Sequence, residues 1–370
     1  MADALKDQYG LEIPRKIAKM IKAVHPKFSD QEFLKTASKN YLKLNLMQRG
    51  HALAAALKQH LPNDFERATA ILSKSLGPRL DQTESTGMSS FLYMPHIFFC
   101  STYGLEHFDT AMQLQYELTQ RFTAEFSIRK FIIADQDRTL KLLKKWAKDP
   151  SEHVRRLVSE GIRPRLPWAE RLRKFQQDPR PVIELLNLLK DDSSLYVRRS
   201  VANCLNDISK DNPEIFYQTI KSWSKPNCAK RTWLINHALR TAIKRGEPEA
   251  LKVLGYDKKP QLQITKISIT PSTIKIGANC QITVNLKNKL SKAQEILIDL
   301  KINYVKANGR SNPKVFKLTK IKLDPLSTSI ISKKISFKQL TTRKHYPGCH
   351  RFDLIINGCA FKLGELNLTK

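Results

Sequence analysis

The stretch DPSEHVRRLVSEGI, residues 149–162, decides the fold of this chain because it returns, altered, as DDSSLYVRRSVANCLNDI at residues 191–208. The shared Val-Arg-Arg begins at Val154 and again at Val197, 43 residues later. This spacing is typical of HEAT-type repeats, in which each helical unit packs on its neighbours and leaves a groove along the inner helices. The sequence therefore predicts a short helical solenoid, with weaker copies at 126–132 and 230–240.

The first copy has the pattern of an amphipathic helix. At 100° per residue its apolar residues share one stripe and its charged residues cluster opposite. The apolar set is Val154, Leu157, Val158 and Ile162, and the charged set is Arg156, Glu160 and Arg163. We therefore expect one face to pack and the other to present charge. Pro164 and Pro167 prevent the helix from continuing.

Beyond this helix, a stiff segment combines cations with an aromatic ring. Arg163, Arg165 and Trp168 fall within six residues. Guanidinium groups suit phosphates, and a flat indole suits a base or a sugar. The segment therefore points to nucleic acid.

The overall charge points the same way. The chain has 64 Lys and Arg against 34 Asp and Glu, a net charge of +30, and its hydrophobic content of 41% is that of a folded protein. An excess this large favours a polyanionic partner, most economically nucleic acid. A basic structural protein, or lysines that only keep the chain in solution, are the alternatives.

Several classes of protein are disfavoured. The six cysteines show no CxxC pair and no zinc spacing with histidine, so we expect reduced thiols. The sequence has no glycine-rich nucleotide motif, no HExxH and no GxSxG, which disfavours nucleotide hydrolysis and metal chemistry. No signal peptide pattern and no apolar run of membrane-spanning length is present. We expect a cytoplasmic protein without cofactors or membrane contact.

The fold class expected is mainly α, a HEAT-like solenoid followed by an all-β immunoglobulin-like sandwich. Helical periodicity appears near 13–24, after Ser29, at 50–60 and 63–76, and from about 105 to about 254, while the aromatic stretch 80–103 is interpreted as a packed connection. After Tyr256 short alternating runs predict strands. We therefore expect a helical domain over 1–258 and a sandwich over 259–370.

The sandwich carries 21 Lys and Arg against 5 Asp and Glu, about half of the excess charge. An accessory DNA-binding domain is the interpretation we favour. Lysines that protect edge strands from aggregation are the alternative.

Acidic residues in the predicted groove are the candidates for chemistry. Aligning the two copies makes Arg156 equivalent to Arg199, and places Glu160 and Asp207 on adjacent helices. A third acid, Glu125, lies at the edge of an apolar stripe. Carboxylates repel phosphate, so in such a groove they indicate a site. The alternative is a structural role: Glu160 pairs with Arg156, Asp207 pairs with Arg199 or caps a neighbouring turn, and Glu125 pairs with Arg129 or another cation.

Four blocks between about Met94 and Tyr256 resemble one known family. They are TAEFSIRKF, VRRLVSEGIRPRLPWAERL, VRRSVANCLNDISKDNP and HALRTAIKRG, beginning at residues 123, 154, 197 and 237. They are similar to the bacterial DNA alkylation-repair glycosylases of the AlkC type, HEAT-like relatives of AlkD. The β-sandwich resembles the immunoglobulin-like extension of one branch.

The resemblance implies a monofunctional DNA glycosylase of base excision repair. It would hydrolyse the N-glycosidic bond of cationic N-alkylated bases such as N3-methyladenine in duplex DNA, without metal or cofactor, as a monomer in the bacterial cytosol, nucleoid-associated when bound to DNA. By position, the catalytic acids would be Glu125, Glu160 and Asp207, the lesion contact Trp168, and the arginines near the site Arg156 and Arg163, to which the groove pattern adds Arg165 and Arg199 for DNA binding. A non-catalytic HEAT-repeat scaffold for nucleic acid or an acidic protein is the alternative.

Overall fold

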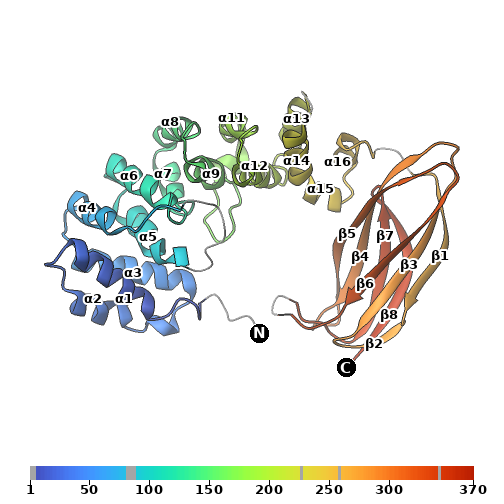
Figure 1. Ribbon diagram of the computed structural model, residues 1–370, viewed down its shortest axis with the longest axis horizontal. Helices are drawn as coiled ribbons and strands as arrows, with labels where there is room; N and C mark the ends of the chain where they lie inside the picture. The colour runs from blue at the N-terminus through green and yellow to red at the C-terminus, as the bar shows by residue number, and fades with distance from the viewer. Residues whose placement is uncertain (1–5, 81–88, 226–227, 257–259, 341–342) are drawn as a thin grey trace. The chain divides into compact units, whose positions relative to one another are not determined.

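A computed structural model describes residues 6–80, 89–225, 228–256, 260–340 and 343–370. The chain divides into two compact units, Ala2–Ala238 and Leu239–Lys370. The first is helical and the second contains the β-sandwich (Figure 1). Within the described ranges no helix is both long and apolar enough to cross a membrane.

The helices before the repeats are mostly those expected. Their bounds are α1 Glu12–Val24, α2 Asp30–Ser38, α3 Leu46–His60, α4 Phe65–Ser75, α5 Met94–Tyr103 and α6 Phe108–Thr119, with short 3-10 helices η1 Tyr41–Lys43 and η2 Ser89–Tyr93. The interpretation of 80–103 as a connection was wrong for α5. This helix is buried nearly all round, with Ile97, Phe99 and Cys100 fully buried, so its sequence lacks the amphipathic period by which surface helices are recognised.

The repeat region forms two rows of helices, as expected. Its helices are α7 Ile128–Ala134, α8 Gln136–Trp146, α9 Glu152–Gly161, α10 Arg173–Gln177, α11 Arg180–Leu189, α12 Leu195–Ile208, α13 Pro213–Trp223 and α14 Ala229–Ala238. Figure 1 shows α9, α12 and α14 side by side in one row, with α8, α11 and α13 in the other. The HEAT-like prediction is confirmed. The inner row provides the framework for the candidate site.

One arginine in each copy makes the same hydrogen bond, which supports the repeat assignment. Arg155, Arg198 and Arg231 each donate from Nη1 to the backbone carbonyl six residues earlier, at 2.7, 2.6 and 3.1 Å. The three carbonyls precede α9, α12 and α14 in the sequence, so the same bond recurs at the same place in each copy. The weak copy at 230–240 is therefore a third member of the series.

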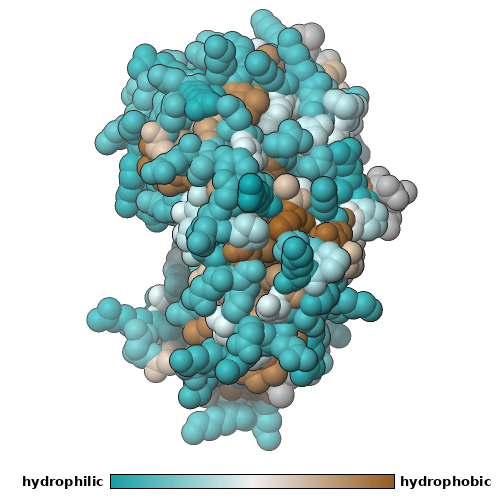
Figure 2. All heavy atoms as spheres, turned by 90° about the vertical axis from the view of Figure 1, so that its left-hand side faces the viewer, coloured by the Kyte–Doolittle hydropathy of each residue, from teal (hydrophilic) through white to brown (hydrophobic). Residues whose placement is uncertain are grey.

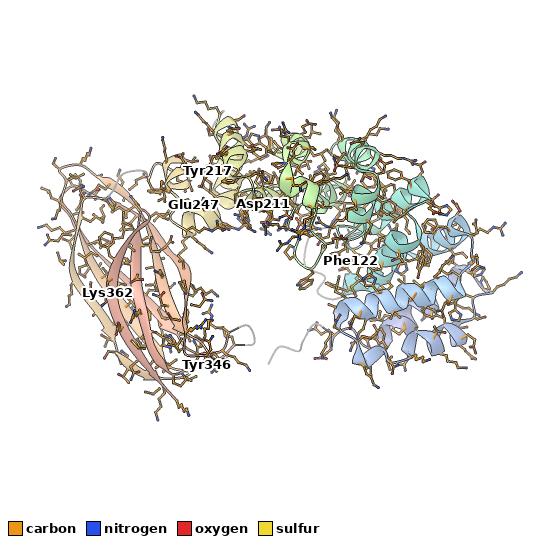
Figure 3. All side chains as sticks on the ribbon, turned by 180° about the vertical axis from the view of Figure 1, so that it is seen from behind. Phe122, Asp211, Tyr217, Glu247, Tyr346 and Lys362 are labelled. Atoms are coloured by element: carbon orange, nitrogen blue, oxygen red, sulfur yellow. The ribbon has the colours of Figure 1, made fainter. Side chains whose placement is uncertain are left out.

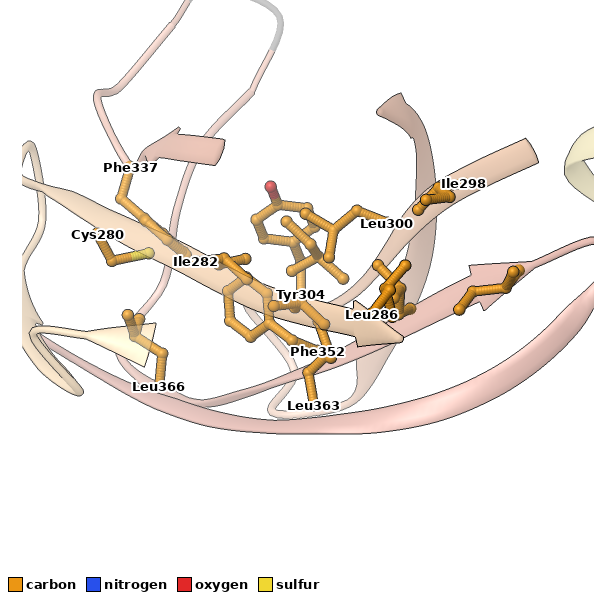
Figure 4. Packing of buried hydrophobic residues seen from close by; sticks show 14 of the residues in the cluster. Cys280, Ile282, Leu286, Ile298, Leu300, Tyr304, Phe337, Phe352, Leu363 and Leu366 are labelled. Carbon is orange, nitrogen blue, oxygen red and sulfur yellow. The ribbon is translucent and has the colours of Figure 1, made fainter. Parts of the chain in front are cut away.

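The second unit contains two sheets packed face to face. Its strands are β1 Leu262–Thr270, β2 Thr273–Lys275, β3 Asn279–Asn288, β4 Gln294–Val305, β5 Ser311–Leu323, β6 Thr328–Ser336, β7 Gly348–Ile356 and β8 Cys359–Thr369. The sheets have the orders β1-β3-β6 and β2-β8-β7-β4-β5. Side chains such as Leu300, Tyr304, Phe337 and Phe352 fill the core between them (Figure 4). The sandwich is confirmed, and β2 and β8 are strands that the sequence patterns did not single out.

Two further helices, α15 Arg240–Lys244 and α16 Pro248–Val253, belong to the sandwich unit. The domain boundary expected between 258 and 259 lies outside the described residues. The compact units divide 20 residues earlier, after Ala238. The physical reason is packing, because Leu251 and Tyr256 form a small apolar cluster with Leu297 of β4.

Candidate active site

The three acids expected at the site come together in space. Glu125 lies in the turn before α7, Glu160 near the end of α9, and Asp207 near the end of α12. Their side chains are 12%, 7% and 3% exposed. Carboxylates so deeply buried need cationic or hydrogen-bonding partners.

Arg156 is the first such partner, and it joins Glu125 to Glu160. Its guanidinium forms an ion pair with Glu125 Oε2, and its Nη2 lies 3.6 Å from Glu160 Oε1. It also donates to Thr123 Oγ1 at 2.9 Å and lies 5.3 Å from the ring centroid of Tyr196. Burial alone would lower the pKa of Arg156, but the two carboxylates outweigh burial and raise it. Arg156 therefore stays charged.

Arg163 is the second partner, and it joins Glu160 to Asp207. Its Nη1 donates to Glu160 Oε1 at 2.5 Å and its Nε donates to Asp207 Oδ2 at 2.8 Å. Lys210 Nζ binds the other oxygen of Asp207 at 2.9 Å. Burial opposes ionisation of Glu160, but Arg156, Arg163 and a hydroxyl together lower its pKa. Glu160 is therefore held as a carboxylate.

These six residues form what we call the charge cluster: Glu125, Arg156, Glu160, Arg163, Asp207 and Lys210. Negative and positive groups alternate along it. Much of the charge that follows the apolar stripe of α9 is buried in these ion pairs, since Glu160 and Arg163 are only 5% and 8% exposed. Glu160 does pair with Arg156, whereas Asp207 pairs with Arg163 instead of Arg199, and Glu125 with Arg156 instead of Arg129.

The other two arginines expected to bind DNA lie in different surroundings. Arg165 forms a two-pronged ion pair with Asp211, with Nε–Oδ2 and Nη2–Oδ1 distances of 2.7 and 2.5 Å. Arg199 is exposed and has no ion pair with any described residue. Figure 3 labels Asp211, which lies in the turn after α12. The DNA-binding roles of Arg156, Arg163, Arg165 and Arg199 stay predictions.

Trp168 lies on the loop between α9 and α10 that also carries Arg163. It is 67% exposed and adopts φ = +63°, a backbone conformation that side chains with a Cβ disfavour. A cavity of about 140 Å³ beside it is lined by Phe98, Phe126, Arg129 and other residues. Backbone strain of this kind clusters at functional sites. The lesion contact of Trp168 stays a prediction.

Arg129 holds this loop in place. It is 1% exposed and donates to the carbonyls of Gly161, Arg163 and Glu170. Sequence reasoning considered it only as a partner of Glu125, because the loop's need for donors is visible only in three dimensions. Among the described residues, no three His, Cys, Asp or Glu side chains lie so as to share a metal ion.

Comparison with known proteins identifies relatives of this chain. Residues 122–245 match the family model of DNA alkylation repair enzymes, and residues 263–370 match that of the C-terminal Ig-like domain of YhaZ. The uncharacterised protein YhaZ of Bacillus subtilis is 35% identical over 359 residues, which are 97% of each chain. The Pseudomonas fluorescens alkylpurine DNA glycosylase AlkC, solved with DNA containing an abasic site analog, is 37% identical, with full coverage of both chains and a TM-score of 0.92.

The chain belongs to the AlkC family.

The AlkC family's repair-enzyme model, which matches residues 122–245, includes every residue of the charge cluster and the loop that carries Trp168. Sequence reasoning missed Lys210, although its position three residues after Asp207 on the helix was a usable signal. It also missed Tyr196, whose contact with Arg156 joins α12 to α9 and has no local signature.

Proposed function

We propose that this chain is a monofunctional DNA glycosylase of base excision repair. Its substrate would be duplex DNA with cationic N-alkylated bases such as N3-methyladenine, and it would hydrolyse their N-glycosidic bond. The observation that carries this proposal is the charge cluster, which gathers three carboxylates from three elements. The relationship to an alkylpurine DNA glycosylase that matches over the full chain supports it.

The proposed reaction needs no general-acid catalysis of base departure. A cationic base leaves with the electron pair of its bond to C1′ and becomes neutral, so it needs no proton. The sugar becomes oxocarbenium-like, and carboxylates can stabilise it. Water then bonds to C1′ and gives its proton to a carboxylate. The atoms and charges balance without a cofactor.

Glu125 is our candidate for binding that water. Its Oε2 is occupied by Arg156 and by Thr123 Oγ1, which donates at 2.9 Å, but no donor among the described residues reaches its Oε1. Asp207 has both oxygens bound, by Arg163 and Lys210. Glu125 is also the most exposed of the three acids. We assign Glu160 and Asp207 to charge stabilisation.

DNA binding would rest on Trp168 at the lesion, on the arginines near the site and on the basic sandwich. The face of the protein shown in Figure 2 is mostly hydrophilic, with apolar patches between the hydrophilic residues. We also propose that the protein acts as a monomer in the bacterial cytosol, since a single chain supplies the whole charge cluster.

The test is to incubate the folded protein with methylated duplex DNA and to follow the release of N3-methyladenine. Release above background is expected. No release would contradict the proposal. A non-catalytic scaffold would in addition bind lesion-bearing and undamaged DNA equally well.

A further inference from the structure

Ser200 stands where the repeat pattern calls for an apolar residue. Alignment of Val154 with Val197 makes it the equivalent of Leu157, and the two side chains are 3% and 0% exposed. Ser200 therefore puts a hydroxyl into the buried contact between α9 and α12. A hydroxyl in such a place is unfavourable unless it is hydrogen-bonded.

The hydroxyl is used in a short chain of hydrogen bonds that crosses from one helix to the next. Ser159 Oγ of α9 donates to Ser200 Oγ of α12 at 2.7 Å, and Ser200 Oγ donates to Glu160 Oε2 at 2.6 Å. Both donors point the same way, and such chains strengthen each link. The chain ends on a carboxylate of the charge cluster.

The result is a carboxylate fixed from two sides. Glu160 Oε1 faces Arg163 and Arg156, while Oε2 faces Ser200. The arginines alone would hold one oxygen and leave the group free to turn about its last bond. Ser200 removes this freedom, and its hydrogen bond also contributes to the lowered pKa of Glu160.

We propose that Ser200 is a positioning residue for the proposed glycosylase reaction: it fixes the orientation of the Glu160 carboxylate, and Ser159 supports it from behind. This proposal rests on the proposed function, because Glu160 needs a fixed orientation only if it acts on a developing positive charge. Preorganised charge of this kind stabilises a transition state without reorganisation at the moment of reaction.

The test compares four variants of the full-length protein, of which Ser200→Thr is the rescue that keeps the hydroxyl. Ser200→Ala removes the bond to Glu160. Ser159→Ala leaves that bond in place and removes the outer link, together with the 3.1 Å contact of Ser159 Oγ with the carbonyl of Arg156. Ser209→Ala is the matched control, since this hydroxyl lies just after α12 and donates to the backbone carbonyl of Asn206 and not to a side chain of the charge cluster. Two quantities are measured: the titration of the Glu160 carboxyl by carbon-13 NMR without DNA, assigned with Glu160→Gln, and the single-turnover excision rate against pH.

For Ser200→Ala we expect the Glu160 titration to move to higher pH, and the rate to fall about tenfold with unchanged DNA affinity. The acid limb of the rate profile should move with the titration. Ser159→Ala should show a smaller change in the same direction, and Ser209→Ala none. Ser200→Thr, which keeps the hydroxyl, should restore most of the rate.

Two results would overturn the proposal: a Ser200→Ala titration like that of Ser209→Ala, or a shifted titration with an unchanged rate. If the wild-type protein releases no base, the proposed function fails separately, and the titration still decides whether the hydrogen-bond chain controls Glu160.

Discussion

Arg163 Nε donates to Asp207 Oδ2 at 2.8 Å, across 44 residues of sequence. This single bond joins the loop that carries Trp168 to the next inner helix of the solenoid. Because the same guanidinium also binds Glu160, the two acids share one cation. A change at either acid is therefore expected to affect the other, and single substitutions here will not have additive effects.

Glu160→Gln should lower the excision rate by about 100-fold or more, because the side chain keeps its shape and loses its charge. DNA affinity should stay the same or improve, since a negative group is removed from a phosphate-binding surface. Glu125→Gln should act in the same direction. Single-turnover kinetics and a binding titration measure the two effects. Glu152→Gln, at the other end of α9, is the control. Normal turnover with a large loss of affinity would make these acids structural.

Trp168→Gly and Trp168→Ala should both weaken excision, because both remove the indole. They should differ in stability. At φ = +63° glycine is unstrained and alanine is not, so the glycine variant should be more stable by about 0.5 to 1 kcal/mol. Thermal or denaturant unfolding measures the difference. Equal stability of the two variants would mean that the loop relaxes and that the conformation is not held.

Arg129→Lys should destabilise the protein by about 2 to 4 kcal/mol, because an ammonium cannot reach the three separated carbonyls that the guanidinium binds. Its neighbour provides the control: Lys130 pairs with the Glu170 side chain at the surface, where both groups are more than half exposed. Lys130→Met should therefore cost less than about 1 kcal/mol. Denaturant unfolding compares them. Similar losses would contradict the assignment of Arg129 as the clamp of the loop.

The basic sandwich should contribute to DNA affinity and not to chemistry. A groove of about 860 Å³ at one end of it is lined by Lys306, Lys314, Lys344 and other residues. Replacing these lysines with glutamine should weaken binding. It should also reduce the salt dependence of log K by up to about 0.9 for each DNA phosphate that is no longer neutralised. The single-turnover rate at saturating protein should not change. Lys333→Gln with Lys334→Gln, on β6, is the control, and an equal effect there would remove the groove's special role.

His96 should make stability depend on pH. It is fully buried with neither ring nitrogen bonded, and burial lowers its pKa from 6.5 to about 4. Between these two pH values the unfolded chain binds a proton at His96 and the folded chain does not. The free energy of unfolding is therefore highest above about pH 6.5 and falls as the pH drops towards 4. The loss reaches about 3 kcal/mol. His96→Leu should flatten this dependence, and His107→Gln, at an exposed ion pair, should not.

The sequence was sufficient for the architecture because periodicity reports which faces are buried. The Val-Arg-Arg repeat predicted the inner helices, and alternation predicted most strands of the sandwich. Prediction from periodicity failed where a helix is buried on all sides. The helix α5 is apolar all round, so its sequence shows no helical period. The helical pattern of α15 and α16 does not indicate which unit they pack against.

At the site, the sequence identified the acids and missed how they are held. Spacing predicts partners one helical turn apart, such as Glu160 and Arg156. It does not predict that Arg129 turns away from Glu125 to bind a loop 32 to 41 residues further along the chain. Nor does it show Ser200 as more than an ordinary polar residue of a helix.

The alternation of charges in the cluster has a consequence for how DNA would approach it. Three carboxylates and three cations sum to zero formal charge, so the field of the cluster falls off with distance faster than that of a single ion. Beyond a few layers of water, screening by salt removes the remaining field of the cluster. DNA would therefore be attracted by the rest of the basic surface as if the six groups of the cluster were absent. Their charge would be felt only at contact, by a base or sugar already lying against them.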